Sequence, residues 1–250
     1  MIAEAAKSLE RFLLPNACVV CGTVMPATEA DGLVCPVCRS RARRVTGGCD
    51  RCHQPLPPVG PCRFCAAWSP AIRWVRSAFW LEDVTRTVVH HLKYENCAML
   101  ADLMADLMVG ILPRPAGGWL VPIPAGRRRV RARGYNQALL MAERLGRRWR
   151  LPVASACLRR ARETKTQTAL TPAGRLSNVA GAFVGIEAPA MIRAPGSRVR
   201  QAILVDDVLT TGATLDAAAS ALASAGWPAV GAVTFARAMP FQTRVLSNLS

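Results

Sequence analysis

The sequence predicts an α/β protein in which a parallel sheet, with helices on both faces, follows a small cysteine-rich domain. Three observations lead to this prediction. Short apolar segments alternate with segments of helical periodicity from residue 75 to residue 238. The segment Ala202–Val205 is apolar without alternation, as expected for a strand that is buried on both faces. Eight of the ten cysteines lie between Cys18 and Cys65 in C-x-x-C pairs, a spacing typical of metal binding.

The alternation begins with a strand and two helices. Aromatic and apolar side chains over residues 77–81 favour a strand, and the apolar spacing over residues 84–92 favours a helix. Asp102 and Asp106 interrupt the apolar segment 99–112 at a helical spacing, so we predict an amphipathic helix there and no membrane span.

The later elements follow from turn residues and periodicity. Pro122 ends a short strand over residues 119–122, and a basic loop follows over residues 123–133. Residues 162–177 are Thr-rich and without periodicity, which predicts a long mobile loop. We also expect helices over residues 135–149 and from residue 213, and strands over residues 179–184, 202–205 and 229–235.

Length, composition and charge limit the class of protein. The 250 residues suffice for one medium and one small domain, and an apolar content of 51% excludes a mainly disordered chain. The net charge of +16 and a pI near 10.6 predict attraction to polyanions such as nucleic acid and pyrophosphate. Thirteen arginines and a single acid, Glu143, lie between Arg114 and Arg162, although each of these arginines alone is best interpreted as a solvated surface residue.

No signal peptide is apparent, because Glu4, Lys7, Glu10 and Arg11 interrupt the N-terminal segment. We therefore expect a cytoplasmic protein with reduced thiols. The expected organisation is an N-terminal helix over residues 1–15, a metal-binding domain over residues 16–70, the α/β domain over residues 75–238, and a tail over residues 239–250.

The cysteine pairs predict zinc. One C-x-x-C pair supplies two thiolates from a tight turn, and a second pair completes a tetrahedral site. The simplest arrangement is two consecutive four-thiolate sites, and interleaved pairing remains an alternative. Both sites have four protein ligands and no open position, which favours a structural role for about two zinc ions. The consecutive sets are Cys18, Cys21, Cys35 and Cys38, then Cys49, Cys52, Cys62 and Cys65.

Residues 203–214 (ILVDDVLTTGAT) have the features of a site for a sugar phosphate. Asp206 and Asp207 follow an apolar strand, and carboxylates there need partners. A turn rich in threonine and glycine then leads into a helix whose free N–H groups attract anions. The alternative is an ordinary strand–turn–helix with an N-capping threonine and solvated acids.

This segment resembles the motif of type I phosphoribosyltransferases that binds phosphoribosyl pyrophosphate (PRPP). The resemblance implies that Asp206 and Asp207 hold the ribose hydroxyls. It also implies that a loop holds the 5′-phosphate, and this loop consists of Thr210, Thr211, Gly212, Ala213 and Thr214.

Other segments are similar to those of the ComF/GntX-like proteins. They are VPIPAGRRRVRARGYNQ at residues 121–137, TKTQTALTPAGRLSNVAGAF at residues 164–183, and Leu92-Lys93-Tyr94. The resemblance covers nearly the whole chain in the family's order. It implies a double zinc ribbon ahead of a type I phosphoribosyltransferase-like domain. Members of this family are linked to DNA uptake during natural competence or carry names that suggest amidophosphoribosyltransferase activity.

The resemblance also implies roles for particular cations. Arg127 and Arg128 are the first candidates for contact with pyrophosphate, and Arg131 and Arg133 come next, since guanidinium groups suit phosphate oxygens. Lys165 lies in the segment that corresponds to a flexible loop closing over the site, and it is a candidate catalytic residue together with Asp206 and Asp207. An exposed loop lysine is an equally good interpretation of Lys165. Mg²⁺ is expected to accompany PRPP.

Two functions remain open from the sequence. The first is a phosphoribosyltransferase, an enzyme of the glycosyltransferase class, that transfers the phosphoribosyl group from PRPP or a related sugar phosphate to an unknown acceptor. The second is a non-catalytic protein that binds single-stranded DNA during uptake, together with other DNA-uptake proteins. No glutaminase domain is apparent, which disfavours a complete amidophosphoribosyltransferase.

Overall fold

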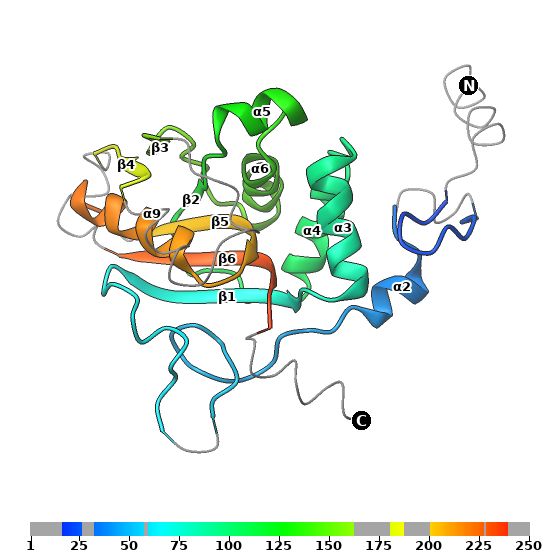
Figure 1. Ribbon diagram of the computed structural model, residues 1–250, viewed down its shortest axis with the longest axis horizontal. Coiled ribbons are helices and arrows are strands. Elements are labelled where there is room, and N and C mark those ends of the chain that lie inside the picture. Colours follow the sequence, from blue (N-terminus) through cyan, green and yellow to red (C-terminus); the bar gives the residue numbers. More distant parts are fainter. Residues whose placement is uncertain are drawn as a thin grey trace.

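The computed structural model describes residues 17–26, 33–57, 60–162, 181–187, 201–227 and 229–239, and its centre is a parallel sheet. The sheet has the strand order β1-β6-β5-β2 (Figure 1). These strands are β1 (Ile72–Trp80), β6 (Val230–Arg237), β5 (Ala202–Leu209) and β2 (Trp119–Pro122). All three pairs of neighbouring strands are parallel, as the alternating sequence predicted.

Helices cover both faces of the sheet, which confirms the predicted fold class. One face carries α3 (Asp83–Tyr94), α4 (Leu100–Val109) and α6 (Gln137–Trp149), and the other carries α9 (Ala213–Ser224) (Figure 1). Successive side chains of β5 enter two different cores. Ile203 and Val205 pack with the three helices, whereas Ala202 and Leu204 pack with α9. A strand without polar alternation is the expected result of this two-sided burial.

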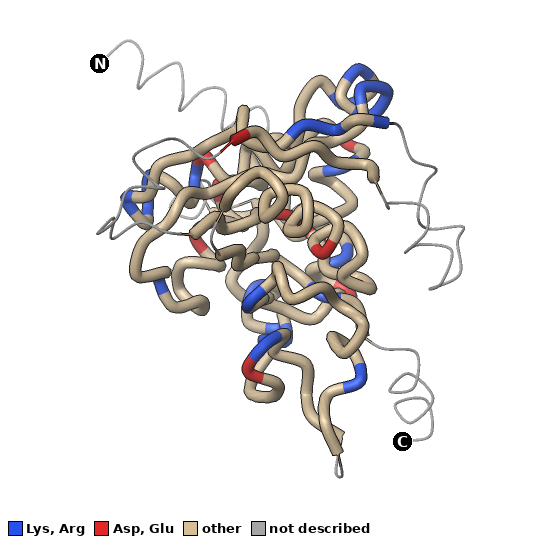
Figure 2. The backbone as a smooth tube through the Cα atoms, turned by 90° about the vertical axis from the view of Figure 1, so that its left-hand side faces the viewer, with Lys and Arg blue, Asp and Glu red and all other residues tan. Residues whose placement is uncertain are grey.

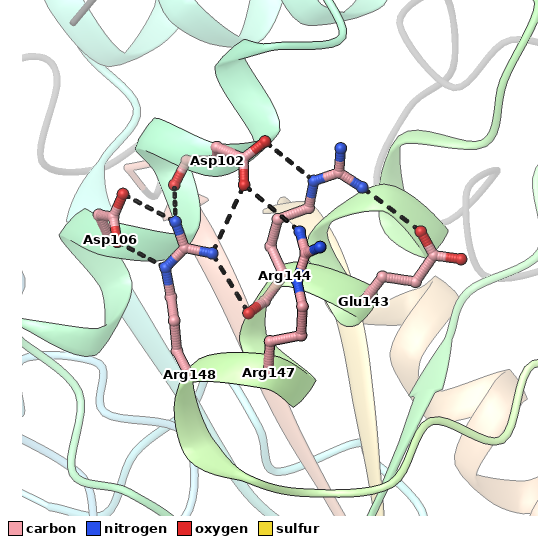
Figure 3. A network of polar contacts seen from close by, with 6 residues as sticks. All are labelled: Asp102, Asp106, Glu143, Arg144, Arg147 and Arg148. Carbon is pink, nitrogen blue, oxygen red and sulfur yellow. Dashed lines mark hydrogen bonds and ion pairs between the residues drawn. The ribbon is translucent and has the colours of Figure 1, made fainter. Parts of the chain in front are cut away.

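The acids of α4 pair with arginines of α6 and join the two helices (Figure 3). Arg148 binds Asp106 through Nε at 2.5 Å and Nη2 at 2.8 Å, and Arg144 Nε lies 3.1 Å from Asp102 Oδ2. Arg147 completes the network at 3.6 Å from Asp102. These pairs are partly exposed, so each contributes only about 0.2–1 kcal/mol. They also engage three of the thirteen arginines of the basic stretch with acids.

Some elements differ from the sequence expectation. Residues 123–133 are not one continuous loop, because they contain the helix α5 (Arg127–Arg133). No residue of α5 is buried, so no apolar periodicity could reveal it. A short antiparallel pair also went unpredicted, formed by β3 (Leu158–Arg160) with β4 (Phe183–Gly185). β4 starts later than the strand we expected over residues 179–184.

Several predicted segments cannot be compared with the structure. The N-terminal helix over residues 1–15, the tail from residue 240 and almost all of the loop over residues 162–177 lie outside the described residues. Within the described part of the chain, no helix is long and apolar enough to cross a membrane.

The two cysteine-rich segments dock at different places on the α/β domain. The first contains α2 (Pro36–Arg41), which has Cys35 as its N-cap residue and contacts α3. Its buried cysteines pack into the core on the face of α3, α4 and α6. Cys52 and Cys65 of the second segment instead pack into the core that contains α9.

Candidate functional site

Asp206 and Asp207 lie inside β5, immediately beyond the end of the neighbouring strand. β2 pairs with β5 only as far as Pro122, which lies opposite Val205, whereas β6 accompanies β5 to Leu209. We predicted that the strand ends before the acids, and this is wrong because β6 continues to supply hydrogen-bond partners. At Asp206 and Asp207, β5 is therefore paired with β6 on one side and is not paired with β2 on the other.

Asp207 is only 3% exposed and forms an ion pair with Lys93 from the last turn of α3. Lys93 Nζ lies 2.7 Å from Asp207 Oδ2. Burial lowers the pKa of Lys93, but attraction to Asp207 outweighs burial, so this pKa lies above its ordinary value. Oδ2 is itself buried, and the Lys93 ammonium is its partner among the described residues.

Asp206 has the most perturbed carboxyl group of the site. Burial and the neighbouring Asp207 raise the pKa of Asp206 to about 8, against the opposing effect of Lys93. Its Oδ1 accepts a 2.9 Å hydrogen bond from the backbone N–H of Asp207. A carboxyl group in this state is stabilised by a proton, a cation or a hydroxyl donor, and a ribose offers two neighbouring hydroxyls.

The loop after β5 leads into a helix N-terminus, as predicted. α9 begins at Ala213, directly after Gly212, which has a left-handed φ of +83°. The Thr211 hydroxyl accepts a 3.4 Å hydrogen bond from the Ala213 N–H, and Gly212 is the N-cap residue of the helix. Free N–H groups at the start of this helix favour an anion.

A single pocket of about 490 Å³ brings these parts together. Asp206, Asp207, Thr210, Gly212 and Thr214 line one part of it. The remaining walls carry an excess of cations from α3, α5 and β3, which are Arg86, Lys93, Arg129, Arg133 and Arg160. Acids that suit sugar hydroxyls thus lie beside cations that suit phosphate oxygens.

Of the arginines predicted to contact pyrophosphate, Arg133 lines the pocket, whereas Arg127, Arg128 and Arg131 are not in its lining. Arg127 and Arg128 are exposed on the first turn of α5, whereas Arg129 and Arg133 of the same helix line the pocket. Arg133 is held in place by a 2.6 Å hydrogen bond from Nε to the carbonyl of Lys93. The roles of Arg127 and Arg128 stay predictions, and Lys165 lies outside the described residues.

Lys93 is the site residue that sequence reasoning missed. It drew attention only as part of the Leu92-Lys93-Tyr94 segment, without a role. Its partner Asp207 lies on a different element, so local periodicity could not reveal the ion pair. The similarity of Leu92-Lys93-Tyr94 to the family segment was the only feature that pointed to Lys93.

The eight paired cysteines form two four-cysteine clusters in the consecutive arrangement. Within each cluster all four Sγ atoms lie within 4.8 Å of one another. The Sγ–Sγ distances of 3.8 Å for Cys21–Cys35 and for Cys49–Cys65 are those of a zinc tetrahedron. Zn–S bonds of about 2.3 Å place two sulfurs about 3.8 Å apart. The cysteines are free thiols, and both clusters are consistent with structural zinc.

Metal analysis of the folded, reduced protein should give about two zinc ions per chain. Cys38→Ser and Cys65→Ser should each remove one ion independently, because these cysteines belong to different clusters. Mass spectrometry under native conditions and inductively coupled plasma analysis measure both quantities. A metal content near zero in the folded wild type would contradict the assignment.

Replacing Asp206 with Asn should remove a pH-dependent loss of stability in the ligand-free protein. In the unfolded chain an aspartate ionises near pH 4, whereas folded Asp206 keeps its proton until the pH approaches 8. This proton stabilises the folded state at low pH, and the contribution is lost as the pH rises through 8. Relative to Asp206→Asn, the wild type should therefore lose up to roughly 1 kcal/mol of unfolding free energy per pH unit from about pH 5 to 8.

Urea denaturation across this pH range measures the difference. Asp83→Asn, at an exposed acid in the first turn of α3, serves as the matched control. Parallel pH profiles for the wild type and Asp206→Asn would show that the pKa of Asp206 is not raised.

Comparison with known proteins identifies relatives of similar length. No family model matches the chain. It is 28% identical to the "DNA utilization protein YhgH" of Escherichia coli K12, over 84% of this chain and 87% of that protein. It is 29% identical to the "Competence protein ComFC" of Bacillus subtilis, over 79% of this chain and 81% of that protein. Identity to the "Competence protein F" of Haemophilus influenzae is 34%, over 39% of this chain and 40% of that protein. Over most of its length, the chain is thus similar to proteins named for DNA utilization and competence, and it has two four-cysteine clusters ahead of a parallel α/β domain.

Proposed function

We propose that the pocket binds PRPP or a related phosphorylated sugar and that the protein transfers the phosphoribosyl group to an acceptor. The observation that supports this proposal is the meeting of two acids and a helix N-terminus in one pocket. Asp206 and Asp207 accept hydrogen bonds from the ribose hydroxyls. The loop from Thr210 to Thr214 and the first N–H groups of α9 bind the 5′-phosphate.

The proposed reaction is a displacement at the anomeric carbon. A bond forms from a nitrogen of the acceptor to this carbon, the bond to the pyrophosphate oxygen breaks, and the acceptor proton passes to solvent. The protein positions both reactants and stabilises the charge on the leaving group. Arg129, Arg133 and Arg160 line the pocket where they can meet pyrophosphate oxygens. Mg²⁺ entering with PRPP would supply further charge neutralisation, and carboxylate oxygens such as those of Asp206 and Asp207 are ligands of the type that it binds.

Above pH 8, where Asp206 is ionised, the double variant Asp206→Asn/Asp207→Asn should lose PRPP affinity by at least about 100-fold, because hydrogen bonds to charged groups are worth about 1.5–3 kcal/mol each. Isothermal titration calorimetry in the presence of Mg²⁺ measures the affinity. Asp83→Asn should bind as the wild type does. Equal affinity of the double variant and the wild type would remove the acids from the ribose site.

Turnover separates binding from catalysis. Pyrophosphate release from PRPP should be tested against nucleobases, amines and oligonucleotides. Tight PRPP binding without release in any of these mixtures would favour a binding protein over an enzyme.

A basic helix face favours single-stranded DNA binding as a second candidate function. α5 exposes Arg127, Arg128 and Arg131, and cations are dense at the top of Figure 2, where Figure 1 places α5. The names of the relatives refer to DNA utilization and competence, which supports a role in DNA uptake together with other uptake proteins. We also propose a cytoplasmic location, because clusters of free thiols require a reducing compartment.

Affinity for single-stranded DNA should fall steeply with salt if α5 contacts phosphates. The triple variant Arg127→Ala/Arg128→Ala/Arg131→Ala should flatten the slope of log K against log salt by about 2, because each contact to a single strand contributes about 0.7. Arg147→Ala, in which the lost guanidinium is paired with Asp102, serves as the control. Fluorescence anisotropy measures these slopes, and a flat response in the wild type would count against this function.

A further inference from the structure

The proposed phosphate loop rests on a tryptophan that belongs to the second cysteine-rich segment. Trp68 follows Cys65 closely in the chain and is 6% exposed. Its Nε1 donates a 3.2 Å hydrogen bond to the backbone carbonyl of Thr211. A side chain from the metal-binding segment therefore contacts the backbone of the loop between β5 and α9.

Gly212 has a second physical requirement besides its left-handed backbone. A Cβ atom at this position would lie 2.1 Å from Cζ2 of Trp68 and 2.4 Å from Cε2. The indole thus occupies the space that any side chain at position 212 would need. From the sequence we placed Gly212 in the loop that holds the 5′-phosphate, and the structure adds that the missing side chain leaves room for Trp68.

Neighbouring contacts extend this attachment along α9. The backbone N–H of Ser69 donates a 2.8 Å hydrogen bond to Asp216 Oδ1. The hydroxyls of Ser69 and Ser220 lie 3.0 Å apart. Trp68 and Ser69 together hold the loop and the first turns of the helix whose N-terminus faces the pocket.

Arg51 connects Trp68 to the second four-cysteine cluster. It lies between Cys49 and Cys52, and its guanidinium reaches several backbone carbonyls of the segment that follows Cys62. Nη1 donates to the carbonyl of Cys65 at 3.0 Å, and Nη2 donates to that of Trp68 at 3.3 Å. The position of the Trp68 backbone therefore depends on the turn that contains Cys49 and Cys52.

Arg237 provides a second connection at the end of β6. It is fully buried between the rings of Phe64 and Trp80, and its Nη1 donates a 2.6 Å hydrogen bond to the carbonyl of Cys52. Among the described residues, its Nε and Nη2 have no hydrogen-bond partner. A buried cation without sufficient partners is costly, and four thiolates around one divalent metal carry a net negative charge that would offset it.

Arg237 also lies next to the start of the loop. It is opposite Leu209, the last residue of β5, and the Ala238 N–H donates a 2.8 Å hydrogen bond to the Leu209 carbonyl. The second cluster is thus connected to both ends of the segment from Leu209 to Gly212, through Arg237 at Leu209 and through Trp68 at Gly212. The first cluster packs against the opposite core and has no such contact among the described residues.

We propose that the second four-cysteine cluster is a metal-dependent support for the phosphate loop, with Trp68 as its positioning residue. Metal binding fixes the turn at Cys49–Cys52, Arg51 transmits this geometry to Trp68, and Trp68 holds Thr211 and Gly212 in the conformation that receives the anion. Loss of this metal lowers the affinity for a sugar phosphate although no cysteine touches the ligand. This inference rests on the proposed function for the identity of the ligand, whereas the support of the loop by the cluster does not depend on which ligand binds.

Hydrogen exchange of the ligand-free protein tests the support without any assumption about the ligand. Trp68→Ala and Cys65→Ser should accelerate exchange over residues 210–216 by about tenfold or more. Trp74→Ala is the matched control, because Trp74 also packs on a glycine, Gly231, and donates a 3.3 Å hydrogen bond to Gln201 Oε1. Trp74→Ala should leave exchange over residues 210–216 unchanged.

The choice of cluster is tested in the same experiment. Cys38→Ser removes a metal ligand of the first cluster, and exchange over residues 210–216 should respond to Cys65→Ser and not to Cys38→Ser. Metal analysis confirms that each variant has lost one ion. Equal exchange in the two cysteine variants, or in Trp68→Ala and Trp74→Ala, would overturn the proposal.

PRPP affinity supplies the second readout. Trp68→Ala and Cys65→Ser should weaken PRPP binding by about tenfold, and Trp68→Phe should recover most of this loss because a ring still fills the space beside Gly212. If Trp68→Ala does not fold, Trp68→Phe replaces it, because this variant loses the hydrogen bond to Thr211 but keeps a ring beside Gly212. Absence of PRPP binding in the wild type would defeat the proposed function, whereas the exchange experiment would still decide whether the cluster supports the loop.

Discussion

Two adjacent carboxyl groups lie in one buried strand, where burial, and then repulsion by Asp207, disfavours the charged form of Asp206. Asp207 has Lys93 as its counter-charge, and Asp206 is left with a pKa of about 8. The repulsion is tolerated because the acids lie beyond the end of β2, where the strand edge is open. Buried carboxyl oxygens without partners are costly. A ligand that brings hydroxyl donors or a cation would therefore stabilise this site.

The two-sided burial of the sheet explains how distant segments meet at this edge. Both faces of β5 are covered, and its partly exposed residues are Asp206 and Val208 in its carboxyl-terminal half. They line the pocket where α3, α5 and the loop before α9 converge. Parallel α/β sheets generally bind ligands at this position. The arginines of the basic stretch have two different roles. Three of them pair with acids and join α4 to α6, namely Arg144, Arg147 and Arg148. Three others line the pocket, namely Arg129, Arg133 and Arg160.

Local patterns predicted the parts of the structure that depend on neighbouring residues. The limits of β2, the start of α9 at Ala213 and the consecutive grouping of the cysteines all follow from turn residues or from C-x-x-C spacing. Features that depend on distant contacts could not be predicted in the same way. The pairing of Lys93 with Asp207, the contact of Trp68 with Gly212 and the extension of β5 beside β6 each join residues far apart in the chain. α5 escaped detection for a different reason, since a helix without a buried face has no apolar period. The assignments of Lys165, Arg127 and Arg128 stay predictions.

The position of Trp68 bears on how this protein can be divided. A boundary between a metal-binding module and an α/β module would be drawn near residue 70, between the last cysteine and β1. Yet Trp68 belongs to the same hydrophobic core as Leu215 and Leu222 of α9, and Cys52 and Cys65 are members of that core too. Separating the chain there would expose apolar surface on both fragments and leave the space beside Gly212 unfilled. The second cysteine-rich segment and the α/β domain therefore share one hydrophobic core, and this segment buries its apolar side chains against α9.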